Sequence, residues 1–241
     1  MSDLVARRQA LQADRHAELE LRLRRLLAPL AGDEHALDVG CGTGALAYAL
    51  APLVGAVVGV DESADYVAAA QASAPPNCTF ATDDAEALSF PYGDFDLVGC
   101  LRVLHHAHRP ELVVAELARV TRPGGRILLV DQLGDVDPIR SLEQDRFERA
   151  RDPSHTRLLP DADIRGVLDA NDLVVTTNEI VQERREMGRY LDLVGLEGEE
   201  RERVARMAPP VFEVEMGRYV ARKPRVTPSR GGSRTLRRTA P

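Results

Sequence analysis

The chain contains 241 residues, 44% of them hydrophobic, which is enough to bury a core within one α/β domain. Its net charge is −7, and because residues 221–241 hold seven basic side chains and no acid, residues 1–220 carry −14. This acidic body argues against nucleic acid as a partner. The sequence has no run of about eighteen apolar residues and starts without a secretory signal, so we expect a cytoplasmic protein without a membrane span.

The first predicted element is an amphipathic helix over residues 14–30, ended by Pro29 and the Gly32-Asp33 turn. Its apolar face consists of Leu19, Leu23, Leu26, Leu27 and Leu30. The helix either packs on the sheet or acts as a lid over a substrate, and both interpretations stay open. We expect residues 1–33 to form an N-terminal helical cap.

A glycine-rich turn follows in the stretch Leu37-Asp38-Val39-Gly40-Cys41-Gly42-Thr43-Gly44-Ala45. A short apolar strand leads into it and an apolar helix, residues 46–53, leads out of it. Glycines at alternate positions allow the chain to reverse and a ligand to approach the main chain. The spacing also fits the dinucleotide-binding fingerprint, so the turn alone does not separate a nicotinamide dinucleotide from another nucleoside ligand.

Asp38 bears on the choice of ligand because it immediately precedes the glycines. A carboxylate there would repel a pyrophosphate and suit a cationic amine, such as the ammonium of S-adenosylmethionine (SAM). The same side chain could instead cap the turn. This residue favours SAM over NAD without deciding between them.

Two more strands and a helix come next. Residues 56–60 form a continuous apolar run, typical of a buried parallel strand, and Asp61 at its end could accept both ribose hydroxyls. Ser63 is a predicted N-cap for a helix over residues 64–73. Residues 78–82 form the third strand, and the acids that follow it could accept a hydrogen bond from an adenine amine.

The alternation continues with a buried strand over residues 95–101, a helix opened by Pro110 and a strand over residues 126–130. The segment Arg122-Pro123-Gly124-Gly125 is expected to end that helix. Strands and helices in this order predict an α/β fold with a doubly wound, mostly parallel sheet.

Three histidines, His105, His106 and His108, follow the fourth strand. Adjacent residues point in different directions, and no fixed partner lies nearby in sequence, so a hydrogen-bonding or substrate-facing role is favoured over a metal site. The cysteines Cys41, Cys78 and Cys100 follow neither metal nor redox spacing, and we expect them to be reduced and buried. We therefore expect no metal.

The second half has weaker signals. Helices are predicted over residues 135–151, anchored by Leu142 and Phe147, and over residues 161–170. Long strands are predicted over residues 173–183 and 212–220, the second with the alternation of an antiparallel edge. Helical insertions are expected near residues 132–160 and 187–208, and a basic disordered tail over residues 226–241.

Taken together, five segments resemble the class I SAM-dependent methyltransferases of the ubiquinone/menaquinone-biosynthesis type. They are the glycine turn, Gly59-Val60-Asp61, Asp84-Ala85-Glu86-Ala87-Leu88, Leu104-His105-His106 and Arg122-Pro123-Gly124-Gly125. The resemblance is strong over about residues 30–131 and specific for SAM as a set. It implies a Rossmann-like seven-stranded sheet with an antiparallel last strand, and a methyltransferase domain over residues 34–225.

The resemblance also implies which residues bind SAM and its product S-adenosylhomocysteine. Asp38 and the glycine turn would hold the methionine moiety, Asp61 the ribose, and Asp84 with Ala85 the adenine. Leu101 and Arg102 would lie near the methionine end, and His106 matches the usual histidine of the family. The full implied set is Asp38, Gly40, Cys41, Gly42, Gly44, Asp61, Glu62, Asp84, Ala85, Leu101 and Arg102.

The expected reaction is attack by a carbon, oxygen or nitrogen nucleophile of a small molecule on the SAM methyl group, with positioning and exclusion of water as the main tasks of the protein. His155 is the first candidate for a general base, followed by His106 and Asp131. Arg151 and Arg157 could hold an anionic acceptor. His155 could equally tie its loop to a neighbouring carboxylate.

Two other functions remain open: an NAD(P)-dependent oxidoreductase, and a SAM-binding regulatory module without catalytic activity. An oxidoreductase would share the glycine turn but leave the segments at residues 84–88 and 122–125 without a role. The acceptor and the oligomeric state do not follow from the sequence.

Overall fold

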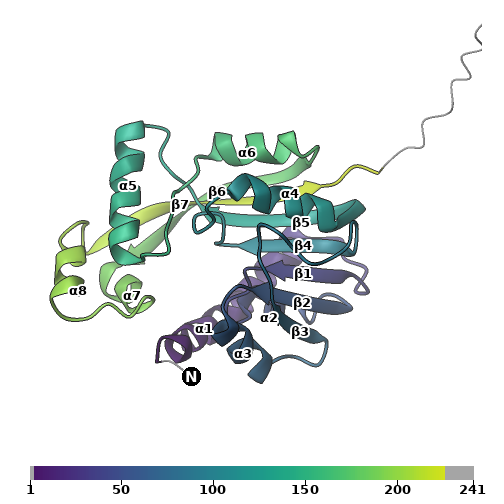
Figure 1. Cartoon of the computed structure of the whole chain (residues 1–241), viewed down its shortest axis with the longest axis horizontal. Coiled ribbons are helices and arrows are strands. Elements are labelled where there is room, and N and C mark those ends of the chain that lie inside the picture. Colours follow the sequence, from purple (N-terminus) through teal and green to yellow (C-terminus); the bar gives the residue numbers. More distant parts are fainter. Residues whose placement is uncertain (1–2, 226–241) are drawn as a thin grey trace, which may run out of the picture.

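The computed structural model describes residues 3–225, which form one mixed sheet flanked by helices (Figure 1). The strands are β1 (His35–Val39), β2 (Ala56–Asp61), β3 (Cys78–Thr82), β4 (Phe95–Leu101), β5 (Thr121–Gln132), β6 (Val174–Glu186) and β7 (Val211–Arg222). The helices are α1 (Asp3–Leu26), α2 (Ala45–Leu50), α3 (Ala64–Ala72), α4 (Pro110–Val120), α5 (Pro138–Arg151), α6 (Asp161–Ala170), α7 (Met187–Asp192) and α8 (Gly198–Ala205).

The sheet has the strand order β3-β2-β1-β4-β5-β7-β6. Strands β1 to β5 pair in parallel, and β7 pairs antiparallel with both β5 and β6. The predicted doubly wound, mostly parallel sheet with an antiparallel last strand is therefore confirmed. The expectation that this last strand lies at the edge is wrong, because β7 uses both of its sides for hydrogen bonds and β6 takes the edge.

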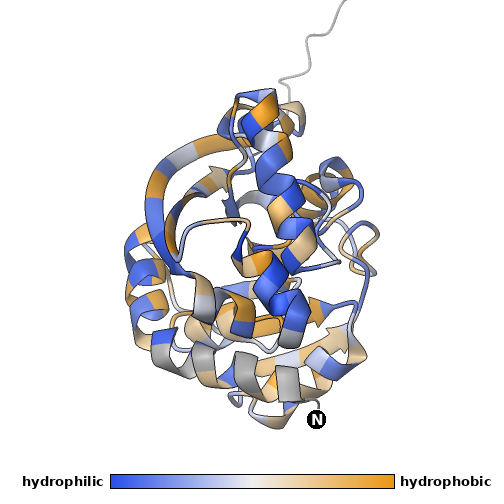
Figure 2. Ribbon diagram, turned by 90° about the vertical axis from the view of Figure 1, so that its left-hand side faces the viewer, coloured by the Kyte–Doolittle hydropathy of each residue, from blue (hydrophilic) through white to orange (hydrophobic). Residues whose placement is uncertain are grey.

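Helices cover both faces of the sheet, and the sheet divides the hydrophobic core of the protein into two main clusters. On one face, Leu117 of α4 and Leu168 of α6 pack with sheet residues such as Ile127. On the other face, Leu23 of α1 and Leu50 of α2 pack with sheet residues such as Leu128. In Figure 2 the helices at the margin of the molecule interleave hydrophilic and hydrophobic residues, as helices with one buried face do.

A third, smaller cluster lies where α5, α7 and α8 gather to one side of the sheet (Figure 1). Phe147, Tyr190 and Phe212 form its aromatic contacts, with ring centroids 5.6–6.3 Å apart. Phe147 was predicted as an anchor of its helix and is buried here. Leu142 was predicted as the other anchor and is 64% exposed, because it lies on the face of α5 that turns away from this cluster.

Several element boundaries differ from the predictions. Helix α1 begins eleven residues before the predicted start at residue 14 and ends at Leu26, short of Pro29, because a residue before proline disfavours helical conformation. Residues 122–125 do not form a helix end but already belong to β5, whose Thr121 pairs with Phe95. The basic tail expected over residues 226–241 lies outside the described residues. No helix within residues 3–225 is long and apolar enough to cross a membrane.

Candidate functional site

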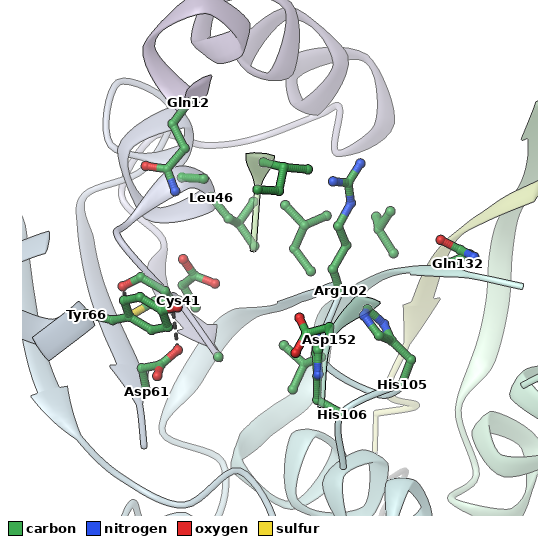
Figure 3. A pocket seen from close by; sticks show the side chains of 18 of the residues that line it. Gln12, Cys41, Leu46, Asp61, Tyr66, Arg102, His105, His106, Gln132 and Asp152 are labelled. Atoms are coloured by element: carbon green, nitrogen blue, oxygen red, sulfur yellow. Dashed lines mark hydrogen bonds between the residues drawn. The ribbon is translucent and has the colours of Figure 1, made fainter. Parts of the chain in front are cut away.

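One large cavity, about 2100 Å³, opens at the carboxyl ends of the parallel strands. In open α/β sheets ligands bind at this edge, where loops leave the strands. The wall includes the glycine turn after β1, the ends of β2, β4 and β5, part of α1, and residues of β6 and β7. Figure 3 shows Cys41, Asp61 and Tyr66 on one side of it, Arg102, His105 and His106 on the other, and Gln12 of α1 above.

The glycine turn has left-handed backbone conformations, with φ of +69° at Gly40, +53° at Gly42 and +92° at Gly44. At Gly42 an added Cβ atom would meet no described atom within 4 Å, so the space beside it is open. At Gly40 and Gly44 the Cβ atom would clash with Val103 and Tyr48, so these two glycines are required by packing. Gly44 is the one member of the implied SAM-binding set that does not line the cavity; it caps α2 instead.

Asp61 holds the glycine turn in place from the end of β2. Its Oδ2 atom accepts a hydrogen bond of 2.8 Å from the backbone N–H of Gly42, and its Oδ1 atom accepts one of 2.9 Å from Ser63. A carboxylate has about four lone-pair sites, so two remain for a ligand. Asp61 therefore combines an observed structural role with the predicted ligand role, and the first of these was not foreseen from the sequence.

Asp38 is 1% exposed at the base of the turn and lines the cavity. Its Oδ2 atom accepts a hydrogen bond of 2.9 Å from the Ala47 backbone N–H at the start of α2. Burial raises the pKa of Asp38 to about 7, and the Ala47 N–H offsets only part of that effect. A cation beside this carboxylate would restore its charge.

The other residues of the implied SAM-binding set also line the cavity, after the ends of β1, β2, β3 and β4. These are Cys41, Glu62, Asp84, Ala85, Leu101 and Arg102. Asp84 forms a local turn in which its Oδ1 atom accepts from the Glu86 N–H at 2.8 Å. Arg102 has φ of +62°, which is rare for a residue with a side chain and often marks a functional position.

The histidine segment after β4 contains an Asp–His pair. Nδ1 of His105 lies 2.5 Å from Oδ1 of Asp131, which is buried at the end of β5. Burial by itself would raise the pKa of Asp131, but His105 and the neighbouring N–H groups lower it overall, so this residue stays ionised. Since a carboxylate fixes the tautomer and orientation of an imidazole, Asp131 prepares Nε2 of His105 to accept a proton.

His106 forms a hydrogen bond with Ser154 and not with Asp131. Its Nδ1 atom lies 2.9 Å from Oγ of Ser154, which donates to Asp152 at 2.6 Å. Burial, followed by the neighbouring His105, lowers the pKa of His106 to about 4. The ring is therefore neutral and a weak base near pH 7, which makes His106 a poor candidate for a general base.

His155, the first candidate from the sequence, has a side chain with no exposed surface. Its Nε2 atom lies 2.9 Å from Oδ1 of Asp145, and Asp145 also accepts from the Leu158 N–H at 2.9 Å. Burial lowers the pKa of His155 in spite of this carboxylate. The structure corresponds to the alternative considered for this residue, in which it ties its loop to an acid, here one on α5. His155 nevertheless lines the cavity, so its catalytic role stays a prediction beside this structural role.

The two arginines expected to hold an acceptor are also differently placed. Arg157 pairs with Glu111 at 2.8 Å on the exposed surface and does not line the cavity, so that expectation is wrong. Arg151 lines the cavity but is buried, bonded to Glu148 at 2.9 Å and stacked on the Tyr190 ring at 4.1 Å. The contact with Tyr190 joins α5 to α7, whereas the bond to Glu148 lies within α5.

The sequence did not reveal part of the cavity wall. Gln12 and Arg15 come from α1, and Arg185 and Arg218 from β6 and β7. In sequence the latter two are charged residues in strands that alternate, a pattern typical of a solvent-facing side. Within residues 3–225 no group of three or more His, Cys, Asp or Glu side chains is arranged to hold a metal ion.

SAM fits the residues around the glycine turn. Open space at Gly42 allows a ligand to contact the main chain, and a positive partner such as the methionine ammonium would hold the buried Asp38 in its charged form. A pyrophosphate beside Asp38 would add repulsion between like charges. The donor set of the site therefore favours SAM over a dinucleotide.

Comparisons with known proteins agree with this fit. Residues 37–129 match the family model described as a methyltransferase domain. The chain is 34% identical over 158 residues to YcgJ of Bacillus subtilis, an uncharacterized methyltransferase, covering 64% of this chain and 62% of that protein. It is 38% identical over 104 residues to the ubiquinone biosynthesis O-methyltransferase of Albidiferax ferrireducens, covering 41% of each. The chain thus spans less than two thirds of these curated relatives.

Solved structures extend the likeness beyond the matched domain. The YcgJ crystal structure has a TM-score of 0.78 at 25% identity, covering 85% of this chain and 98% of that one. A solved chain from Bacillus halodurans C-125 has a TM-score of 0.79 at 25% identity with the same coverage. The resemblance found in the motifs is confirmed over residues 37–129, the stretch that matches the methyltransferase domain family.

Proposed function

We propose that the protein transfers a methyl group from SAM to the carbon, oxygen or nitrogen atom of a small-molecule acceptor. One observation carries the proposal: a single cavity connects the glycine turn with the His105–Asp131 pair. A site for SAM and a positioned base then face the same cavity. The family match over residues 37–129 supports this reading of the cavity.

In this proposal the binding groups lie along the strand ends. Asp38 faces the methionine ammonium, the backbone at Gly42 contacts the ligand, and Asp61 accepts hydrogen bonds from the ribose. Asp84 and Ala85 border the adenine. Helix α1 covers the cavity with Gln12 and Arg15 and so limits the access of water.

When bound, SAM supplies a methyl group on a positively charged sulfur, so departure of the sulfur requires no acid. The protein then has two tasks: to align the acceptor with the methyl group and, where the acceptor arrives protonated, to remove its proton. His105 accepts that proton at Nε2, while Asp131 holds Nδ1 and stabilises the resulting imidazolium. Asp131 is a positioning residue, since it acts through His105.

The wider assignments are proposals of the same kind. We assign residues 34–225 to the methyltransferase domain and α1 to a cap over its cavity. The acceptor is a small molecule rather than nucleic acid, in keeping with the acidic body of the chain, and the site of action is the cytoplasm. The names of the relatives include an O-methyltransferase, which supports oxygen as one of the three acceptor atoms.

Calorimetric titration of the purified protein with SAM, S-adenosylhomocysteine and NAD tests the proposal. We expect SAM and its product to bind and NAD not to. Incubation with methyl-labelled SAM and fractions of small-molecule extracts should then yield labelled products. Tighter binding of NAD than of SAM would establish the oxidoreductase alternative, and SAM binding without labelled product from any fraction would favour a regulatory module.

A further inference from the structure

Three arginines in the cavity wall share one carboxylate. Glu183 of β6 lies 2.8 Å from Arg185, 3.3 Å from Arg102 and 3.4 Å from Arg218, measured between carboxylate oxygens and guanidinium nitrogens. We call Arg102, Arg185 and Arg218 the Glu183 arginine cluster. Its members come from the loop after β4, from β6 and from β7, and all of them line the cavity.

The cluster has more positive charge than its acids neutralise. Arg218 also approaches Glu179 at 3.7 Å, but Glu179 is already bound by Arg25 through two contacts of 3.0 Å. Four arginines therefore share two glutamates. Nearby acids on the wall have other partners: Glu148 bonds to Arg151 and Tyr190, and Asp152 to Ser154.

Two members of the cluster are buried with unused donors. The side chains of Arg185 and Arg218 are each 9% exposed, and their Nε atoms have no hydrogen-bond partner among residues 3–225. A buried charged group normally makes all of its hydrogen bonds, because an unmet donor loses its water without replacement. Guanidinium groups match oxyanions in particular, since their donors form a planar fork.

Arg102 connects the cluster to the reaction site. It is the residue with φ of +62° directly after β4, three residues before His105, and Figure 3 shows its side chain extending into the cavity. A left-handed conformation is unfavourable for a residue with a long side chain, and such strain occurs mainly where function requires the position. The direction of Arg102 therefore places a positive charge between α1 and the histidine segment.

We propose that the Glu183 arginine cluster binds an oxyanion of the acceptor, so that the acceptor is a small molecule carrying a carboxylate, phosphate or sulfate group. The proposal rests on the methyltransferase function and specifies its substrate class. The anion is held by β6 and β7 while the nucleophilic atom lies near His105. This arrangement orients the acceptor from the side of the cavity away from the glycine turn.

The test uses the full chain saturated with S-adenosylhomocysteine. Calorimetric titration with sodium benzoate and with inorganic phosphate, at constant ionic strength and with chloride as the reference anion, reports whether the site prefers a carboxylate or a phosphate. Arg185→Gln should weaken binding of the preferred anion about tenfold or more, because it removes a charged donor. Arg222→Gln is the matched control, since it removes the same charge at the exposed, opposite end of β7.

Glu183→Gln should change the affinity for anions in the opposite direction from Arg185→Gln. It removes the carboxylate that competes for the arginines, so anion binding should become tighter, whereas a purely structural cluster would gain nothing. Three results would overturn the proposal: no oxyanion bound above the chloride reference, equal losses in Arg185→Gln and Arg222→Gln, or weaker S-adenosylhomocysteine binding in Arg185→Gln. The last result would assign the arginines to the methionine carboxylate. Failure of the unmodified protein to bind S-adenosylhomocysteine would instead refute the proposed function.

Discussion

Asp61 and Gly42 are joined by a hydrogen bond of 2.8 Å from the Gly42 backbone N–H to Oδ2 of Asp61. This bond connects the end of β2 to the turn after β1, two segments that are 19 residues apart. The same carboxylate also accepts from Ser63. A side chain expected to bind a ribose is thus also part of the structure that shapes the site.

Asp61→Ala should therefore change two properties at once. SAM affinity should fall roughly tenfold to a hundredfold, about 1.5–3 kcal/mol, because hydrogen bonds to a charged acceptor are lost. The melting temperature without ligand should also fall, since Gly42 and Ser63 lose their acceptor. Calorimetry and thermal unfolding measure the two effects. Asp65→Ala, an exposed acid in the first turn of α3, serves as the control, and SAM affinity equal to that of the control would remove Asp61 from the site.

Gly42→Val should abolish SAM binding and leave the fold intact. The new side chain would enter space that no described atom fills, at a φ of +53° that valine tolerates poorly. Gly198→Val separates strain from obstruction, because Gly198 has φ of +59°, equally open surroundings among the described residues, and a position outside the cavity. Circular dichroism of both variants reports whether the fold is intact, and titration with SAM reports their affinity. Equal loss of SAM binding in the two would show that strain alone is responsible.

Binding of SAM should weaken as the pH falls below about 7. Burial raises the pKa of Asp38 to about 7, and the methionine ammonium requires this side chain in its ionised form. Each further pH unit below that value should then cost about tenfold in affinity, with release of one proton on binding. Titrations in buffers of different ionisation enthalpy measure both quantities. Asp38→Asn should bind weakly at every pH, and a pH-independent affinity of the unmodified protein would contradict the assignment.

His105→Gln should lower turnover by about a hundredfold or more with an acceptor that arrives protonated, and leave SAM affinity unchanged. The loss should shrink as the pH approaches the pKa of the acceptor, because the nucleophile then loses its proton unaided. Asp131→Asn should show the same pH dependence, since it removes the group that orients His105. His35→Gln, at the start of β1 and outside the cavity, is the control. A pH-independent loss in His105→Gln would indicate a structural role.

His155→Ala should destabilise the protein and leave SAM affinity and turnover unchanged. Removing the ring deprives Asp145 of a buried partner, which costs about 1–3 kcal/mol. That loss corresponds to a melting temperature lower by roughly 2–12 °C for a domain of this size. Differential scanning calorimetry measures it against Arg157→Ala, which removes an exposed ion pair. Normal stability combined with lost turnover would restore His155 as the catalytic base.

The pH dependence of stability gives a second check on His155. Burial lowers the pKa of His155 in the folded protein, so the unfolded chain takes up the proton first. The contribution of neutral His155 to the free energy of unfolding is therefore fully present above the ordinary histidine pKa of about 6.5. It is lost progressively as the pH falls below that value. His106, with its pKa lowered to about 4, contributes in the same direction. His155→Ala should reduce this acid sensitivity without removing it.

Local features of the sequence determined the first half of the protein. Apolar runs gave β2 to β4 with bounds that the structure confirms within one residue, and Ser63 caps α3 as predicted. The glycine turn was equally readable, because left-handed backbone is a local requirement of individual residues. Asp38 and Asp61 could be placed beside it because strand ends in a parallel sheet share one edge.

Tertiary structure alone decided the chemistry of the cavity. Asp131 meets His105 across 26 residues, and Arg102 and Arg218 meet Glu183 of β6 only because the sheet brings three distant segments together. The sequence offered both a catalytic role for His155 and a bond to a neighbouring carboxylate, and only the position of α5 identifies Asp145 as that carboxylate. Contacts between distant segments determine which polar side chains form hydrogen bonds with each other and which are left without a partner. Residue spacing and periodicity do not predict those contacts.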